Sequence, residues 1–292
     1  VFTHDAGSWT QQARLEASDP TDFDQLGYSV SVSGDTIMAG SFYKNGRRGA
    51  AYVFTRDGSN WSEQAKLTAS DADFGDNFGR SVSVSGDTAV IGSPFDEDQG
   101  RDTGSAYVFT RSGTGWSEQA KVIASDAESG DFFGLSVSVS GDTVVVGSDG
   151  DDDIASGAGA AYVFTRSGTS WSEQAKLKAS DPGTSDRFGR SVAVSGDTVV
   201  VGSLFDNDSG SNSGSAYVFT RSGAIWSEQA KLTAGDAANE DRLGASVAVS
   251  GNTVVVGSPQ DDVIVDGLAV EDAGSAYVFV PESVPVDYDF TS

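Results

Sequence analysis

One short phrase, repeated along the chain, constrains the fold more than any other feature. It reads WTQQARL from Trp9, WSEQAKL from Trp61, WSEQAKV from Trp116, and WSEQAKL again from Trp171 and Trp226. The tryptophans lie 52, 55, 55 and 55 residues apart, so most of the 292 residues belong to one structural unit copied in tandem. We therefore expect one repeat domain over residues 1–280, with a C-terminal tail or linker at 281–292, and function where the copies differ.

The unit predicts a β-propeller. The fourth copy reads RFGRSVAVSG, DTVVVGS, an acidic loop, GSAYVFTR, a short turn and WSEQAKL, which are four β-branched or aromatic runs separated by Gly, Ser and Asp. The first run carries small residues, the third carries Tyr and Phe, and the fourth begins with Trp. Sheets arranged radially need small residues at the axis and large rings outside. We expect an all-β, five-bladed β-propeller of four-stranded antiparallel blades.

The two ends of the chain predict how the ring closes. The last copy supplies strands one to three, ending at Ala276–Val280, and the Trp9 strand has no first strand before it. Pairing the N- and C-terminal strands would complete the fifth blade. Val1–Thr3 repeats the VFT of a third strand, which leaves three interpretations: these residues fray, the chain is cut from a longer array, or they pair with a neighbouring molecule.

Charge restricts the classes of partner. The 43 acidic and 18 basic residues give a net charge of −25, which excludes nucleic acid and anionic membrane surfaces by repulsion. Only six of the basic residues are lysine, a balance typical of proteins from hypersaline environments, where salt screens self-repulsion. The alternative is an ordinary acidic secreted protein.

Composition also narrows the chemistry. The chain has no cysteine and one histidine, His4 near the N-terminus, so imidazole-based catalysis is disfavoured. No run of 18 apolar residues occurs, and we expect no membrane insertion. The chain opens at Val1 without a signal-peptide pattern, which indicates a mature or excised protein.

The run FGRSVSVSGDTAVIGSPFDEDQG at residues 78–100 resembles the FG-GAP repeat of integrin α-subunit propellers and their microbial relatives. Phe-Gly, or Leu-Gly in its place, opens all five copies, at Phe78, Phe133, Phe188, Leu26 and Leu243. The resemblance implies a propeller that serves in adhesion, ligand binding or occasionally polysaccharide cleavage.

Two differences from the family limit which of its properties can be expected in this chain. The family usually places a calcium loop of the DxDxDG kind between the first and second strands. Here that connection is only Ser-Gly-Asp-Thr, which cannot wrap an ion needing six to eight oxygens. Integrin propellers also have seven blades rather than five.

Because the strands of each blade alternate in direction, every loop can be assigned to one of two faces. Connections from strand four to one and from two to three emerge on one face, whereas the short SGDT and hairpin turns emerge on the other. The four-to-one loops each carry two aspartates at fixed places, which form either a ring of cation sites or caps of their own turns. These are Asp19 and Asp24, Asp71 and Asp76, Asp126 and Asp131, Asp181 and Asp186, and Asp236 and Asp241.

The two-to-three loops differ from one another, as the loops of a recognition face do, although drift of tolerant surface loops is the alternative. The first loop is basic and the others are acidic. Asp149, Asp151 and Asp153 form the best calcium candidate, and Ca²⁺ is the one cofactor we expect. The candidate ligand-binding residues are Lys44, Arg47, Arg48, Asp96, Asp98, Asp151, Asp152, Asp153, Asp206, Asp208, Asp261 and Asp262.

Other repeated side chains have structural and functional interpretations. The five tryptophans either stack on sugars or fill the outer wedge between blades, and their identical placement favours the wedge. The glutamine three residues after each Trp is interpreted as a hydrogen-bonding strut. Asn60 and Asn207 head glycosylation sequons at predicted turns or loops.

These observations favour an extracellular or cell-surface, non-enzymatic binding or adhesion module, in a high-salt environment, that contacts a cell-surface protein or glycan through the loop-rich face. The alternatives are a structural subunit that self-assembles through its terminal strands, and a polysaccharide lyase or hydrolase that uses a pair of carboxylates. A cleft with one carboxylate of raised pKa would favour the enzyme, whereas a flat, loop-rich rim would favour binding.

Overall fold

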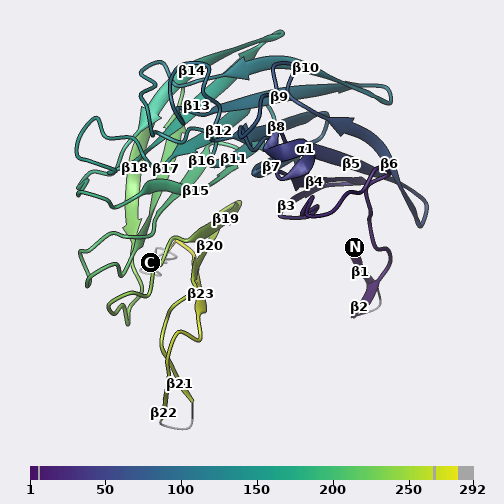
Figure 1. The fold of residues 1–292 in the computed structure, drawn as a ribbon. Coiled ribbons are helices and arrows are strands. Elements are labelled where there is room, and N and C mark those ends of the chain that lie inside the picture. The colour runs from purple at the N-terminus through teal and green to yellow at the C-terminus, as the bar shows by residue number, and fades with distance from the viewer. Residues whose placement is uncertain (6, 266–267, 282–292) are drawn as a thin grey trace, which may run out of the picture.

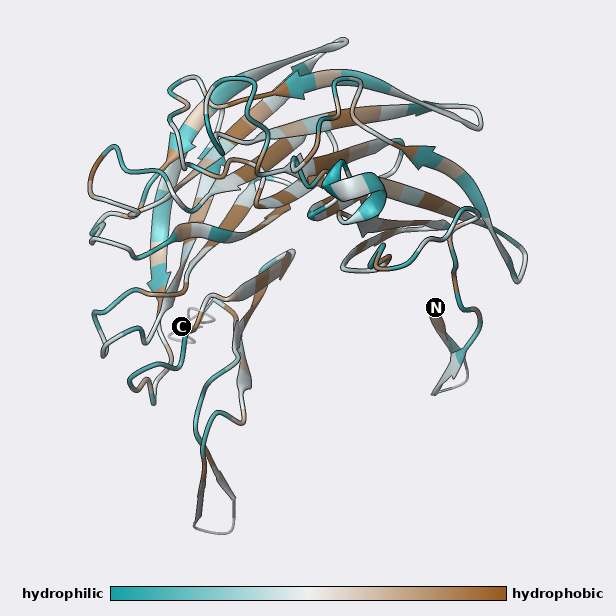
Figure 2. Cartoon of the chain, viewed as in Figure 1, coloured by the Kyte–Doolittle hydropathy of each residue, from teal (hydrophilic) through white to brown (hydrophobic). Residues whose placement is uncertain are grey.

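The computed structural model describes residues 1–5, 7–265 and 268–281. Apart from Pro281, the predicted tail at 281–292 lies outside the described residues. The fold is an all-β, five-bladed propeller, and its one helix within the described ranges is the four-residue α1 (Lys44–Arg47) (Figure 1). Figure 2 shows apolar residues concentrated along the strands and hydrophilic residues in the loops.

Four blades have four antiparallel strands each, in sequence order from the innermost strand outward. Blade 1 is β3 (Ser29–Ser33), β4 (Thr36–Ser41), β5 (Ala50–Asp57) and β6 (Asn60–Leu67). Blade 2 is β7 (Ser81–Ser85), β8 (Thr88–Ser93), β9 (Ser105–Ser112) and β10 (Gly115–Val122). Blade 3 is β11 (Ser136–Ser140), β12 (Thr143–Ser148), β13 (Ala160–Ser167) and β14 (Ser170–Leu177). Blade 4 is β15 (Phe188–Ser195), β16 (Thr198–Ser203), β17 (Ser215–Ser222) and β18 (Ile225–Leu232).

Blade 5 has three strands within the described residues. These are β19 (Ser246–Ser250), β20 (Thr253–Ser258) and β23 (Ser275–Phe279). Its two-to-three loop carries a separate hairpin of β21 (Val263–Val265) and β22 (Leu268–Val270).

The core lies between the blades. The ring of Phe78, at the start of blade 2, is fully buried and meets Tyr107 and Phe109 edge-on, with centroids 5.4 and 6.1 Å away. Gly79 follows with a φ of +87°, and a Cβ there would collide with the carbonyl oxygen of Ala50 in blade 1. The repeated Phe-Gly pair therefore supplies both the wedge and the close backbone approach that joins consecutive blades.

The blades form an open arc, with blade 1 and blade 5 at its two ends (Figure 1). Val30 and Val32 of blade 1 are each 68% exposed, whereas their counterparts in blade 2, Val82 and Val84, are 8% and 5% exposed because blade 1 covers them. The end blades therefore present apolar faces that inner blades bury.

The predicted closure of the fifth blade by the Trp9 strand is wrong. β2 (Ser8–Gln11) pairs with β1 (Phe2–Asp5), and β23 pairs with β20. Phe2 faces Gln11 as Phe109 faces Glu118 in blade 2, so the N-terminal hairpin copies the outer half of a blade. A tight local hairpin costs less loop-closure entropy than a pairing between the chain's two ends. Val1–Thr3 therefore pairs within its own chain.

Candidate functional site

The variable loops gather on one face, as the alternating strand direction predicts. Each four-to-one loop lies against the two-to-three loop of the preceding blade. The backbone N–H of Phe132 donates to the carbonyl of Asp102 at 3.1 Å, and that of Arg187 donates to the carbonyl of Gly157 at 3.2 Å. These bonds join the loops into a continuous rim, which we call the loop face.

A pocket of about 450 Å³ opens on the loop face among blades 2, 3 and 4. Arg80 and Arg190 enter it from the position that directly follows Phe-Gly, at the start of the innermost strands, and Arg187 and Arg242 enter it from four-to-one loops. Its apolar lining residues are Phe95, Phe132, Leu135, Leu204 and Phe205. We call this the axial pocket.

One buried carboxylate, that of Asp149, lies among the arginines of the axial pocket and pairs with Arg190. Asp149 is 6% exposed, its Oδ2 lies 3.4 Å from Nη1 of Arg190, and its backbone carbonyl accepts from Nη1 of Arg187 at 3.4 Å. Burial raises the pKa of Asp149, while the charges of Arg190, Arg187 and Arg80 oppose that rise. The pocket therefore carries an excess of positive charge in a chain whose net charge is −25.

Two of the arginines rest on aromatic rings. The guanidinium of Arg80 lies 4.4 Å from the ring centroid of Tyr28 and 5.5 Å from that of Phe42, and that of Arg242 lies 5.3 Å from the ring of Phe205. Among the described residues, Arg80 has no carboxylate within ion-pair distance. Burial lowers the pKa of the Arg80 guanidinium. Aromatic packing thus holds charged groups whose hydrogen-bonding capacity is largely unused.

Comparison with known proteins assigns the repeat. The model of the FG-GAP repeat matches five segments, at residues 9–54, 61–109, 116–164, 171–219 and 226–279. The chain belongs to the FG-GAP repeat family. No curated protein matches the chain. Within the described ranges, no helix is long and apolar enough to cross a membrane.

Each complete FG-GAP unit from blade 2 to blade 4 builds a cluster of three aspartates around a lysine. In blade 2, Nζ of Lys121 lies 2.8 Å from Asp71, 2.8 Å from Asp96 and 2.6 Å from Asp98. Tyr107 donates to Asp71 and Asp96 at 2.7 and 2.8 Å. Burial alone would raise the pKa of Asp96, but bonds from Lys121 and from the backbone of Asp98 hold it below its usual value.

This lysine cluster changes the interpretation of the predicted calcium ligands. Asp151 and Asp153 join Asp126 around Nζ of Lys176, at distances of 2.6, 2.5 and 2.8 Å. Asp149 instead faces the axial pocket. The three predicted ligands are therefore not brought together, and an ammonium group occupies the centre of the carboxylate cluster that does form.

The second aspartate of each four-to-one loop caps its own turn. In blade 2, Oδ2 of Asp76 accepts the backbone N–H of Asp73 at 2.6 Å, and Asp131 accepts that of Glu128 at 2.7 Å. Burial raises the pKa of both carboxyls to about 6; these backbone bonds oppose the rise, and Asp96 and Asp151 add to it. The equivalent bonds are made by Asp24, Asp186 and Asp241.

Lys44 of the basic first loop is buried and pairs with aspartates of the adjacent four-to-one loop. It is 1% exposed, and its ammonium lies 2.7 Å from Asp24 and 3.7 Å from Asp19. Arg47 donates to the Tyr43 hydroxyl at 3.0 Å, and Arg48 is half-exposed. Arg48 lies 3.9 Å from Asp73, so both arginines are at the rim, whereas the Lys44 ammonium is buried.

The remaining predicted residues divide into buried and exposed sets. The buried aspartates Asp96, Asp206 and Asp261 all bond a tyrosine hydroxyl of their own blade. The exposed set is Asp98, Asp152, Asp153, Asp208, Asp262, Asn60 and Asn207. Sequence reasoning missed Arg80, Arg187, Arg190 and Arg242. A signal was present, because the residue after Phe-Gly or Leu-Gly varies among the copies and is arginine in two of them: Tyr28, Arg80, Leu135, Arg190 and Ala245.

The tryptophans and glutamines tie consecutive blades together. Nε1 of Trp116 donates to Oε1 of Gln64 at 2.9 Å, and Trp61, Trp171 and Trp226 make the same bond to Gln12, Gln119 and Gln174. An arginine of the same blade stacks on each of these rings, as Arg111 does on Trp116 at 5.2 Å. These tryptophans and glutamines therefore join consecutive blades rather than form a sugar-binding surface.

Proposed function

We propose that this FG-GAP propeller is a non-enzymatic binding module that recognises an anionic glycan through the axial pocket of the loop face. The observation that carries the proposal is the excess of arginine around Asp149. A guanidinium presents paired N–H donors that match a carboxylate or sulfate, and the aromatic lining suits the apolar face of a sugar ring. The fold by itself supports a binding or structural module.

The rest of the surface supports the same choice of site. Lysines elsewhere on the loop face are engaged by their own blades' aspartates, so repulsion directs an anionic ligand away from most of this acidic chain and toward the axial pocket. We place the protein outside the cell or at its surface, in high salt, because its net charge of −25 favours a screened medium.

Titration with a sulfated polysaccharide, a polyuronate and neutral dextran tests the proposal. We expect binding of one or both acidic polymers and no binding of dextran. Arg80→Gln/Arg190→Gln should weaken binding at least tenfold in a variant that still unfolds cooperatively, whereas Arg101→Gln, an 85% exposed arginine of the loop face outside the pocket, should bind normally. Equal binding by the wild-type protein and the double variant would remove the axial pocket as the site.

A second candidate function is cleavage of a polyuronate, which the raised pKa of Asp149 favours. A buried carboxyl beside arginines could move a proton while the guanidinium groups hold the substrate carboxylate. The two functions make opposite predictions for Asp149→Asn. Loss of that carboxylate should abolish cleavage, whereas binding of the anionic polymer should become tighter.

A further inference from the structure

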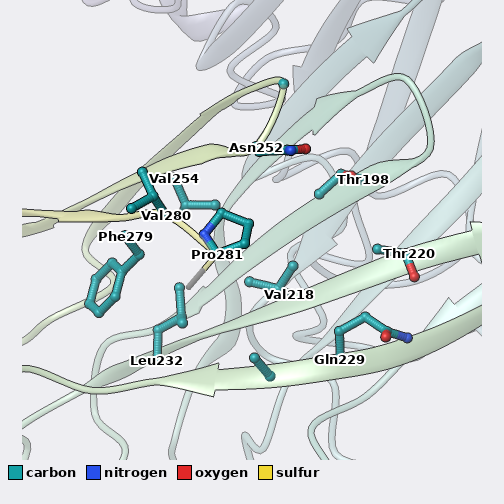
Figure 3. Close-up of a pocket in the computed structure, with 12 residues that line it drawn as sticks. Thr198, Val218, Thr220, Gln229, Leu232, Asn252, Val254, Phe279, Val280 and Pro281 are labelled. Atoms are coloured by element: carbon teal, nitrogen blue, oxygen red, sulfur yellow. The ribbon is translucent and has the colours of Figure 1, made fainter. Parts of the chain in front are cut away.

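A groove between blade 4 and blade 5 is lined by a set of side chains that elsewhere in the chain packs against a tryptophan. The groove has a volume of about 360 Å³ and is mostly apolar (Figure 3). Val218, Gln229, Ala230 and Leu232 line it from blade 4, and Val254 and Pro281 line it from blade 5. We call it the tryptophan slot.

The repeat shows what fills the equivalent position in the complete blades. Trp116, Trp171 and Trp226 each pack against the same apolar cluster as the alanine of the preceding blade that corresponds to Ala230. Each donates to the glutamine that corresponds to Gln229. Gln229 instead bonds Ser227 on its own strand, and Leu232 is partly exposed where Leu177 is 4% exposed.

The chain has one tryptophan that is not packed in this way. Trp9 of β2 is 71% exposed and opens the same phrase as the four packed tryptophans. Its strand therefore carries the side chain that the tryptophan slot lacks.

Charge gives a second, independent match. In blade 5, Tyr277 donates to Asp236 at 2.9 Å and to Asp261 at 3.1 Å, as Tyr107 does to Asp71 and Asp96. Among the described residues, no lysine or arginine lies within ion-pair distance of this pair. Arg14 follows Trp9 at the spacing by which Lys121 follows Trp116, and its side chain is 81% exposed.

The sequence holds a third match. In the complete interfaces a serine bonds a glutamate of the next blade's fourth strand, as Ser70 bonds Glu118 at 2.9 Å. After β18 that serine is replaced by Gly235, and in β2 the glutamate is replaced by Gln11. If β2 were the fourth strand of blade 5, Gly235 and Gln11 would occupy the positions that Ser70 and Glu118 occupy in the complete interface.

We propose that the tryptophan slot receives the β2 strand of a second copy of this chain, which becomes the fourth strand of blade 5. Trp9 then donates to Gln229, Arg14 reaches Asp236 and Asp261, and the edge of β23 that is unpaired within the described part of the chain gains a partner strand. In the complex, the incoming β2 pairs with β23 of the other copy instead of with its own β1. That replacement keeps its register, because β1 already imitates a third strand.

The segment that directly follows the chain's own β2 contacts blade 1, at the opposite end of the arc. Gln12 accepts from Trp61 of blade 1 at 2.7 Å, and the N-terminal hairpin and blade 5 lie at separate ends (Figure 1). The same contact persists in the donor copy, so the strand joins blade 5 of one copy to blade 1 of the next. Reciprocal exchange gives a closed dimer, and one-way exchange gives a chain of copies.

Cysteine pairing tests this proposal, because the chain has no cysteine of its own. Thr110 faces Ser117 in blade 2, so Val280 should face Thr10 across the new pair, at a Cα separation of about 5 Å that suits a disulfide. Thr10→Cys and Val280→Cys are made on separate chains, mixed and oxidised. We expect a covalent dimer that contains both variants.

The double variant Thr10→Cys/Val280→Cys on one chain separates the alternatives. Crosslinked dimers and larger species support exchange between copies. A monomeric disulfide shows that the chain's own strand fills the slot, and the absence of any crosslink at an unchanged melting temperature shows that the slot stays open; either result overturns the proposal.

Sedimentation of uncrosslinked protein gives a second measurement. Trp9→Ala should weaken self-association at least tenfold, while Phe23→Ala, which removes an 86% exposed ring elsewhere, should leave it unchanged. A wild-type protein that stays monomeric at all concentrations would overturn the proposal.

Discussion

Nη1 of Arg190 lies 3.4 Å from Oδ2 of Asp149, and among the residues that the structure describes this pair has no counterpart in the other blades. The residue that corresponds to Asp149 is Phe42, Pro94, Leu204 or Pro259 in the other four copies. Features shared by every FG-GAP unit hold the blades together. A charged pair confined to one blade is not part of that shared architecture, and it therefore marks a candidate functional region.

The lysine clusters are expected to be structural and independent of calcium. Lys121→Met leaves Asp71, Asp96 and Asp98 facing one another without a cation, which should lower the unfolding free energy by about 3 kcal/mol. Lys178→Met is the control, because Lys178 lies 3.7 Å from a single aspartate. Thermal melts measure both variants. A chelator should leave the wild-type melting temperature unchanged, and a large drop would show that a bound cation contributes.

The glutamine struts allow a matched comparison within one chain. Gln64→Ala removes the acceptor of the Trp116 indole and should cost about 1 kcal/mol of unfolding free energy. Gln229→Ala, at the same repeat position but without a tryptophan donor in the isolated chain, should cost less than half of that. Denaturant unfolding at a protein concentration too low for self-association measures the difference. Equal losses would mean that the indole bond contributes little.

The turn-capping aspartates predict a pH dependence of stability. The folded pKa of Asp76 and of Asp131 is about 6, above the ordinary value of 3.8, so the folded state holds their protons more tightly than the unfolded state does. Their contribution to stability is therefore fully present below about pH 4 and is lost as the pH rises to about 6.

Asp76→Asn keeps an oxygen for the Asp73 N–H and removes the charge. Its melting temperature relative to wild type should be higher at pH 7 than at pH 4. The reason is that only the wild-type protein loses stability when the carboxyl ionises in the buried turn. Asp57→Asn, at an exposed position, serves as the control and should show no such trend. A constant difference for Asp76→Asn between the two pH values would contradict the assignment.

Salt should stabilise the fold despite its many ion pairs. A net charge of −25 opposes compaction, and screening of that repulsion outweighs the loss of exposed Arg–Asp pairs such as Arg111–Asp87. We expect the melting temperature to rise steeply between low salt and molar potassium chloride. A flat or falling profile would count against a high-salt environment.

The repeat made the propeller predictable, and individual side chains account for what was missed. Small inner residues and the Trp wedge recur in register, so the blade architecture and the loop face follow from the sequence. Closure was wrong because Val1–Thr3 competes locally for the edge of β2. The role of Lys121 was missed because its ammonium reaches aspartates from two loops, at separations of 50 and 23 residues, that no sequence pattern joins.

Asp149→Asn tests the central claim most directly, because it asks whether the axial pocket is an anion site. At pH 8 the substitution removes the carboxylate that pairs with Arg190, while a similar shape remains. Binding of an acidic polysaccharide should become about fivefold tighter, or about 1 kcal/mol, with no cleavage of the polymer. Unchanged or weaker binding by a variant that melts like wild type would contradict the account.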